Sequence, residues 1–165
     1  MVASIERPWH QATVIQHSQR LLRSFQHWLD RPLLAVEDLS ISTDQAIANA
    51  LFHAPFVLVS HGTEADPILN YGNRQALTLW EMDWVQFTQT PSRLTAEPIE
   101  QEERDRLLAQ AQAKGYSSNY KGIRISSTGR RFSIQDVVIW DVLDEQNQRC
   151  GQAAMFERWE GVGER

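Results

Sequence analysis

The sequence predicts a single α+β domain built on a five-stranded antiparallel sheet, with helices inserted after the second strand. Three observations support this fold class. Two amphipathic helical patterns begin the chain, a short strand hairpin follows them, and a helix-rich stretch then precedes three longer strand patterns. The chain has 165 residues, of which 42% are apolar, so it has the usual size of one domain and can bury a substantial core.

Two helices are predicted at the start of the chain. From Gln11 to Leu29, apolar residues recur at three- and four-residue spacing, as they do in an amphipathic helix. These residues are Val14, Ile15, Leu21, Leu22, Phe25, Trp28 and Leu29. Pro32 then ends the pattern, because proline cannot continue a helix. A second helix is expected from about Asp44 to His53, where Ser42 and Thr43 can cap the first turn.

A hairpin of two short strands is predicted next, at residues 56–60 and 67–71. Both runs are rich in β-branched or aromatic residues, and a glycine-containing loop separates them. Asn73 can then cap a helix whose apolar face continues to Trp84. Residues 88–93 are expected to form a loop.

The longest inserted helix is predicted from Ile99 to Lys114. Pro98 suits its first turn, and Gly115 is a typical residue to end it. The acidic residues near its start are explained by the positive end of the helix dipole and do not indicate a site.

Three strand patterns complete the chain, at residues 117–126, 130–142 and 149–159, and they predict an antiparallel meander. In the middle strand, one face is expected to carry Phe132, Ile134, Val138, Trp140 and Val142. Val137 and Ile139 on the opposite face indicate that this face is buried too. The first helix is the segment expected to cover the second face.

Charge and cysteine content exclude several classes of protein. The formal net charge of −5 makes nucleic acid and anionic membranes poor partners. The single cysteine, Cys150, excludes an internal disulfide and a cysteine-based zinc site. No apolar run has the length of a signal peptide or of a membrane span. We therefore expect a cytoplasmic protein.

The segment from Ala54 to Phe156 resembles the MEKHLA family. This PAS-related domain occurs as a stand-alone protein in photosynthetic bacteria and at the C-terminus of class III homeodomain leucine-zipper transcription factors of plants. The stretch PSRLTAEP, residues 91–98, is its most specific motif here. The other matching segments are residues 56–62, 69–73 with Ala76, 79–81, and 151–154. The resemblance implies a PAS-like fold and a sensory or protein-interaction role, as a stand-alone bacterial member, and it establishes no ligand.

Similarity to PAS domains in general depends on Asn73, which matches the asparagine that begins the first inserted helix of many of them. The cofactor is unknown. A flavin adduct needs a cysteine on the inserted helices, whereas Cys150 lies on the last strand. Haem needs an axial ligand on the helical side, and every histidine precedes the inserted helices. Both cofactors are therefore disfavoured.

The primary hypothesis is a PAS-like module that binds a small, mostly apolar ligand and thereby alters contacts with an unknown protein partner. Its candidate pocket residues are Trp80, Trp84, Tyr120, Trp140 and Phe156. Residues 54–159 form the PAS-like domain in this interpretation. Residues 1–53 form a helical extension that packs on the sheet or dimerises, and residues 160–165 form a tail.

Two alternatives remain open. The first is a ligand-free interaction domain with a filled aromatic core. It works only by dimerising or docking. A homodimer through the first helix is possible under either hypothesis, with Ile15, Leu22, Phe25 and Leu29 as candidate interface residues. The second is a small enzyme on a cone-shaped α+β fold, for which Asp136 is the only candidate base.

Two groups of charged residues are further candidate sites. Lys121, Arg124, Arg130 and Arg131 form a small basic cluster that suits an anionic ligand or partner. His61 with Glu64 and Asp66 could contact a cation, although such loops are usually solvated. No metal site is predicted.

Overall fold

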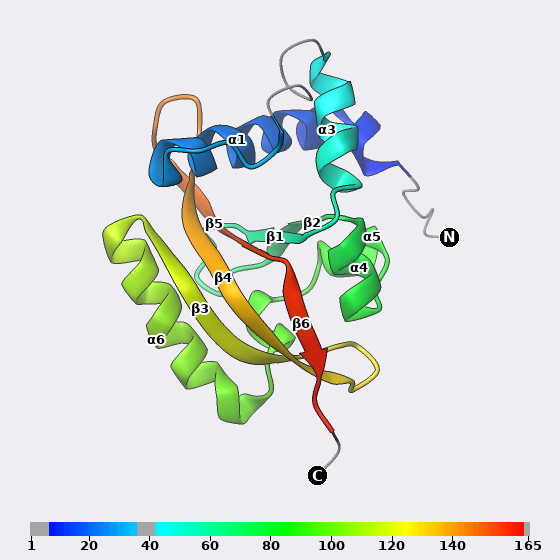
Figure 1. Ribbon diagram of the computed structural model, residues 1–165, viewed down its shortest axis with the longest axis vertical. Helices are drawn as coiled ribbons and strands as arrows, with labels where there is room; N and C mark the ends of the chain where they lie inside the picture. Colours follow the sequence, from blue (N-terminus) through cyan, green and yellow to red (C-terminus); the bar gives the residue numbers. More distant parts are fainter. Residues whose placement is uncertain (1–6, 36–41, 164–165) are drawn as a thin grey trace.

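The computed structural model of the protein describes residues 7–35 and 42–163, and within them the elements follow the predicted order (Figure 1). Parts of the predicted extension and tail, residues 1–6, 36–41 and 164–165, lie outside the described residues. The helical elements are η1 (Pro8–His10), α1 (Ala12–Leu29), α3 (Asp44–Phe52), α4 (Arg74–Trp80), α5 (Trp84–Phe87), η2 (Ser92–Thr95) and α6 (Pro98–Lys114). The strands are β1 (Val57–His61), β2 (Leu69–Gly72), β3 (Tyr116–Ile125), β4 (Arg131–Leu143), β5 (Arg149–Phe156) and β6 (Arg158–Gly161).

All strands form one antiparallel sheet in the order β2-β1-β5-β4-β3, with β6 also paired to β4. The predicted α+β fold class is thus confirmed, with a sixth strand in addition to the five expected. The extra strand arises because the predicted last strand bends at Glu157, so that β5 and β6 pair with successive parts of the same edge of β4. Glu160 and Gly161, expected in the tail, therefore belong to the sheet.

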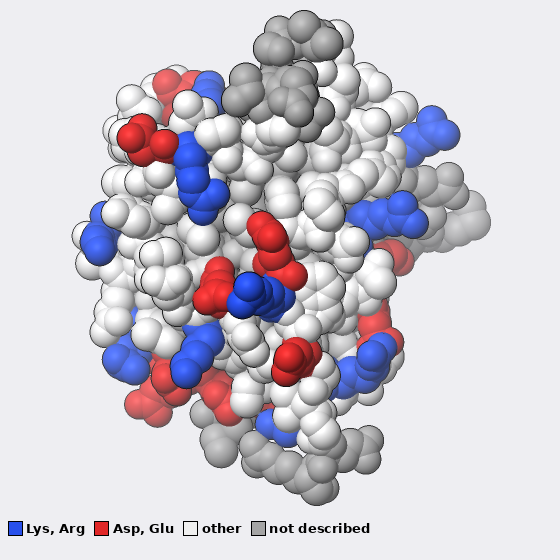
Figure 2. Space-filling model, in the orientation of Figure 1, with Lys and Arg blue, Asp and Glu red and all other residues white. Residues whose placement is uncertain are grey.

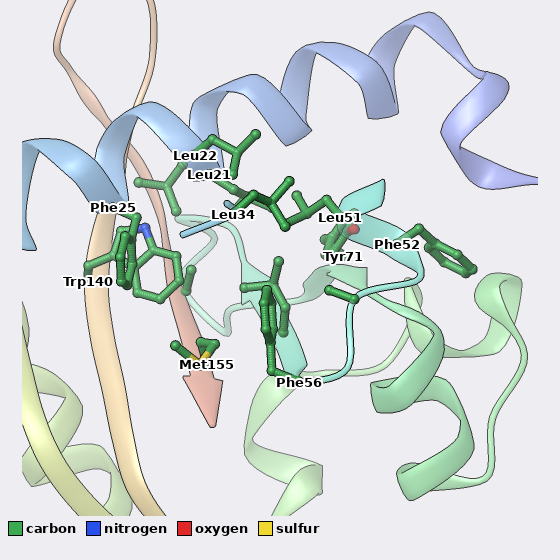
Figure 3. Close-up of a cluster of buried hydrophobic side chains, with 14 of the residues drawn as sticks. Leu21, Leu22, Phe25, Leu34, Leu51, Phe52, Phe56, Tyr71, Trp140 and Met155 are labelled. Carbon is green, nitrogen blue, oxygen red and sulfur yellow. The ribbon is translucent and has the colours of Figure 1, made fainter. Parts of the chain in front are cut away.

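The helix α1 lies across one face of the sheet (Figure 1). The sequence predicts it on the face of Val137 and Ile139, but it covers the face that carries Val138, Trp140 and Val142. Its buried side chains, among them Leu21, Leu22 and Phe25, pack with Trp140 of β4 (Figure 3). The indole N–H of Trp28 donates a hydrogen bond to the backbone oxygen of Asp141 at 2.9 Å. We call this face the α1 face. No helix in the described ranges is long and apolar enough to cross a membrane.

The opposite face is covered by α4, α5 and α6, and we call it the cavity face. Asn73 caps α4 as predicted, since its Oδ1 accepts from the N–H of Ala76 at 3.2 Å. The same oxygen accepts from Leu58 N, and the amide of Asn73 donates to Phe56 O. One buried side chain therefore joins the inserted helices to β1.

The predicted helix from Asn73 to Trp84 is interrupted in the structure. Glu81 adopts a left-handed conformation with φ of 58° and ends α4. Asp83 then caps α5 by accepting a hydrogen bond from Gln86 N at 2.7 Å. The break turns α5 away from α4, so that Trp80 and Trp84 enter different parts of the core.

A bulge at Asp136 reverses the faces of β4. Its φ is 53°, and the pairing with β3 passes from Tyr120–Val137 to Gly122–Ile134, which leaves one extra residue on β4. An extra residue moves every later side chain to the other face. The expected common face is therefore wrong: Phe132 and Ile134 lie on the cavity face with Val137 and Ile139, whereas Val138, Trp140 and Val142 lie on the α1 face.

Candidate functional site

A cavity of about 50 Å³ lies between the cavity face and the inserted helices. Most of its wall is apolar, and the residues on that side include Leu69, Trp80, Phe87, Ile134, Val137, Ile139 and Phe156. The other side is polar and includes His61, Ser92, Thr95, Arg104, Tyr120, Arg124 and Gln152. The cavity thus has an apolar end and a polar, basic end.

Three of the five predicted pocket residues line this cavity, namely Trp80, Tyr120 and Phe156. Trp84 and Trp140 do not. Trp140 is fully buried on the α1 face because the bulge precedes it, and Trp84 packs edge to face with Tyr71, at 5.7 Å between ring centroids, because the helix breaks before it. The expectation that all five share one cavity therefore does not hold for these two tryptophans.

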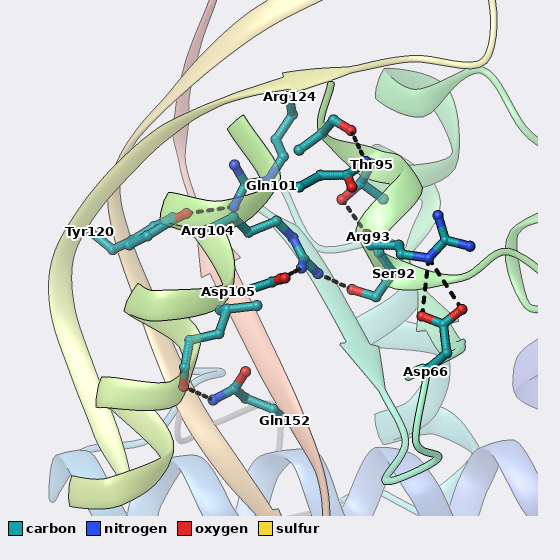
Figure 4. Close-up of polar contacts among 12 residues, drawn as sticks. Asp66, Ser92, Arg93, Thr95, Gln101, Arg104, Asp105, Tyr120, Arg124 and Gln152 are labelled. Atoms are coloured by element: carbon teal, nitrogen blue, oxygen red, sulfur yellow. Dashed lines mark hydrogen bonds and ion pairs between the residues drawn. The ribbon is translucent and has the colours of Figure 1, made fainter. Parts of the chain in front are cut away.

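The polar end is organised by two arginines from different elements (Figure 4). Arg104 of α6 donates to the hydroxyl of Ser92 and to Asp105 Oδ1, the latter at 2.8 Å. Arg124 of β3 donates to the hydroxyl of Tyr120 at 2.7 Å and to the backbone oxygen of Ile123. The side chains of the two arginines are nearly completely buried, with residue exposures of 6% and 7%.

The positive charges at the polar end of the cavity are buried and repel one another in the chain without a ligand. Burial, followed by repulsion from Arg124, lowers the pKa of Arg104 below its ordinary value. Burial is also the main reason that the pKa of His61 is lowered. A buried charge is stable only when it is paired and hydrogen-bonded, so this end of the cavity favours an added negative charge.

Sequence reasoning missed Arg104 because it stands in a charge-rich stretch that reads as a solvated helix face. A usable signal was nevertheless present. Arg104 precedes Leu107, Leu108 and Ala111 by three, four and seven residues, and this spacing places all four on one side of a helix. An arginine on the apolar face of a helix is a candidate for a buried functional charge.

The predicted basic cluster is dispersed by the fold. Arg124 points inward, Arg131 pairs with Glu97, and Arg130 lies 3.8 Å from a carboxylate oxygen of Glu81. Lys121 is exposed. On the face drawn in Figure 2, basic and acidic side chains alternate and form no large area of one sign.

No cation site forms in the loop after β1. His61 contacts the backbone oxygen of Gly62 through Nδ1, Glu64 accepts from Ile68 N, and Asp66 pairs with Arg93. Within residues 7–35 and 42–163, no group of three or more metal-ligating side chains comes together.

The remaining candidate residues lie outside the cavity. Cys150 of β5 packs beside the core of the α1 face, and burial raises the pKa of its thiol. Asp136 is exposed at the bulge, where it pairs with Arg158 at 3.3 Å. The proposed enzyme base is therefore not directed into the enclosed space.

The candidate dimer residues are divided by the packing of α1. Leu22 and Phe25 are buried against the sheet of their own chain. Ile15 and Leu29 are half-buried and remain partly accessible. In this arrangement of α1, a second copy of the chain could therefore contact only Ile15 and Leu29 of the four candidate interface residues.

Comparison with protein families gives one match. The family model of the MEKHLA domain matches residues 15–161, which is most of the chain. The chain belongs to the MEKHLA domain family. The match begins inside α1 and ends with β6, so the MEKHLA model spans the helix that covers the sheet as well as the cavity. No curated protein sequence matches the chain.

The MEKHLA chain is similar in fold to solved PAS and light-oxygen-voltage domains. A PAS domain of a protein from Colwellia psychrerythraea has a TM-score of 0.59 and 15% identity, with 70% of this chain and 92% of that chain covered. A light-oxygen-voltage domain studied with a flavin analogue has a TM-score of 0.56 and 16% identity, covering 72% and 86%. An RNA-binding light-oxygen-voltage receptor has a TM-score of 0.63 and 13% identity, covering 80% of this chain and 36% of that one. At these identities the likeness concerns the fold alone.

Proposed function

We propose that this MEKHLA protein is a sensory module in which a small molecule enters the cavity and α1 relays its presence to a protein partner. The observation that carries the proposal is the position of the cavity and of α1 on opposite faces of the same strands. Val137 and Ile139 of β4 line the cavity. Val138 and Trp140, which alternate with them along the strand, pack beneath α1. If a ligand displaces β4, the side chains of β4 that pack beneath α1 are therefore displaced as well.

A polar contact supports the same coupling at β1. Ser60 borders the cavity, and its hydroxyl lies 2.8 Å from Nε2 of His17 in α1. The same hydroxyl donates to Asn70 of β2. A shift of β1 thus changes a hydrogen bond made by α1, in addition to the apolar packing.

A partner protein binds the outer side of α1 and responds there to the shift of the helix. Arg20 and Arg23 of α1 both pair with Glu145 in the loop after β4, at 2.6 and 2.9 Å. Exposed pairs of this kind hold a helix weakly, usually by less than about 1 kcal/mol. They can therefore be exchanged for contacts with a partner protein.

A second candidate function is the ligand-free interaction domain. The small volume of the cavity, about 50 Å³, favours it, because an engineered apolar cavity that binds benzene measures about 150 Å³. In this alternative the aromatic core is already filled, and the protein acts by dimerising or docking alone.

Native mass spectrometry of the freshly purified protein, compared with its denatured mass, distinguishes the two functions. A reproducible extra mass on each chain is expected for the sensor. Ala154→Leu adds bulk at the cavity wall and should reduce that occupancy, whereas Ala113→Leu on the exposed side of α6 should leave it unchanged.

The relay is tested by hydrogen exchange of the backbone amides of α1 in loaded and unloaded protein. The sensor requires a change in α1 that is lost in Ala154→Leu. A protein without extra mass that is a dimer in its native spectrum would instead favour the interaction domain.

A further inference from the structure

The chemical class of the ligand can be argued from the polar end of the cavity. Arg104 and Arg124 enter the same enclosed space from α6 and β3, and both are more than nine-tenths buried (Figure 4). A guanidinium group carries five N–H donors and stays charged in proteins. Two such groups in one small space are costly unless an anion shares them.

The charges around the two arginines do not balance. Arg104 pairs with Asp105, whose side chain is largely exposed. Among the described residues, no carboxylate lies within ion-pair distance of Arg124, and its polar contacts are the hydroxyl of Tyr120 and the oxygen of Ile123. One positive charge is thus left without a partner, and a monoanion neutralises it.

The donors of the two arginines are only partly used. Each guanidinium donates two hydrogen bonds within the described residues, so each retains N–H groups for an oxygen acceptor. The indole N–H of Trp80, on the cavity wall, is buried and has no acceptor there. Oxygen atoms of a ligand would satisfy the free N–H groups of the two arginines.

We propose that the cavity takes a small monocarboxylic acid, with its carboxylate between Arg104 and Arg124 and its apolar part against Trp80 and Phe156. This inference rests on the proposed sensory function and specifies the ligand of the same site. The planar fork of arginine matches a carboxylate, and a single negative charge matches the single uncompensated positive charge. The apolar wall favours a hydrocarbon body over a second charged group.

The cavity of about 50 Å³ is too small to hold the whole acid, so binding requires α6 to move and the cavity to join the groove beside it. An outer groove of about 540 Å³ lies between α6 and the sheet, and it shares Arg104, Tyr120 and Arg124 with the cavity. Of the side chains of residues 100–114, only those of Arg104 and Ala111 are buried, so α6 is lightly anchored. A carboxylate that bridges Arg104 of α6 to Arg124 of β3 would hold the helix closed over the ligand.

The test uses matched probes that differ only in the charged group. Hexanoate and 3-phenylpropanoate are compared with hexan-1-ol and 3-phenylpropan-1-ol by isothermal titration calorimetry on the full chain. The acids should bind at least tenfold more tightly than the alcohols. Arg124→Gln and Arg104→Gln should each remove at least tenfold of the affinity for the acids and leave the alcohols little changed.

Matched controls separate the two buried arginines from general charge effects. Arg130→Gln removes an exposed arginine of the same hairpin, and Arg106→Gln removes an exposed arginine of the same helix. Both should bind the acids like the unmodified protein. Thermal unfolding of every variant shows whether it is folded, and Arg124→Gln should be folded because it removes a source of repulsion.

The outcomes distinguish this inference from the proposed function. Equal binding of alcohols and acids, or unchanged acid binding in Arg124→Gln, would overturn the carboxylate assignment while leaving a ligand-binding sensor in place. If neither the acids nor the alcohols bind, the carboxylate assignment is also overturned. The proposed sensory function is then decided by whether native mass spectrometry detects an extra mass on the chain.

Discussion

Phe25 of α1 and Trp140 of β4 meet edge to face, with ring centroids 4.9 Å apart and an interplanar angle of 79°. Both side chains are fully buried. Aromatic pairs in this arrangement contribute beyond the area that they bury. The contact joins α1 to the central part of the sheet, opposite the cavity, and is one of the contacts through which the proposed relay would act.

Replacement of Phe25 by a smaller residue should destabilise the monomer. Phe25→Ala is expected to lower the free energy of unfolding by about 3–5 kcal/mol, because it leaves a cavity under α1. Ile15→Ala, at a half-buried position of the same helix, should cost about 1 kcal/mol. Urea denaturation measures both. If Phe25 lay in a dimer interface instead, Phe25→Ala would change the oligomeric state and leave monomer stability nearly unchanged.

Gly115 ends α6 directly against the ring of Trp28. Its φ is +99°, and an added Cβ would lie 2.4 Å from a ring carbon. Gly115→Ala should therefore destabilise the protein through both backbone strain and this clash, by about 2–4 kcal/mol in total. Gly129→Ala is the matched control, since Gly129 has φ of +89° with nothing within 4 Å of the added Cβ. It should lose only about 1 kcal/mol. Equal losses in thermal unfolding would contradict the role assigned to Trp28.

Asn73 should be the most important cap among the helices that the structure describes. Asn73→Ala leaves buried backbone groups of β1 and α4 without partners, and each buried unsatisfied group costs about 1–3 kcal/mol. Asp83→Ala removes an exposed cap of α5 and should cost about 1 kcal/mol. Chemical denaturation of both variants gives the comparison. A loss for Asn73→Ala no larger than for Asp83→Ala would show that the link to β1 is unimportant.

His17 should make stability depend on pH. Burial, with a smaller contribution from Arg20, lowers the pKa of its imidazole from 6.5 to about 4. The unfolded chain therefore binds a proton more readily than the folded one, and stability falls as the pH drops from about 6.5 toward 4. The loss from this group is about 3 kcal/mol at most.

The variant His17→Gln isolates this contribution, because it cannot take up the proton. It should lose less stability than the unmodified protein over the same pH window in urea denaturation. Glu145, with its pKa lowered to about 2 chiefly by the hydrogen bond from Arg20, acts at lower pH. Parallel pH profiles for the two proteins would exclude His17 as the titrating group.

Local signals were sufficient for most elements. The three- and four-residue spacing before Leu29 predicts α1, and Pro98 with Gly115 predicts the limits of α6, because periodicity, proline and glycine act on the backbone near them. Asn73 was predicted as a cap for the same reason. The order of these elements was then enough to predict the fold class. The face of Val137 and Ile139, expected to lie under the first helix, is instead covered by the inserted helices.

The candidate site was only half predictable. Trp80, Tyr120 and Phe156 were expected at the cavity and line it. Trp140 was not placed correctly, because strand side chains alternate between faces and the bulge at Asp136 reverses the alternation. Arg104 gave no strong signal, since a charged residue in a polar helix is usually exposed.

The sequence by itself determined the helices, the strands and the alternation of apolar residues, because these follow from contacts between residues close in the chain. Only the tertiary structure decided which face of β4 Trp140 occupies and that Arg104 and Arg124 share one enclosed space. Both depend on the pairing of segments far apart in the chain. A residue such as Asp136 tolerates a left-handed backbone without requiring it, so the packing around β4 determines whether the bulge forms.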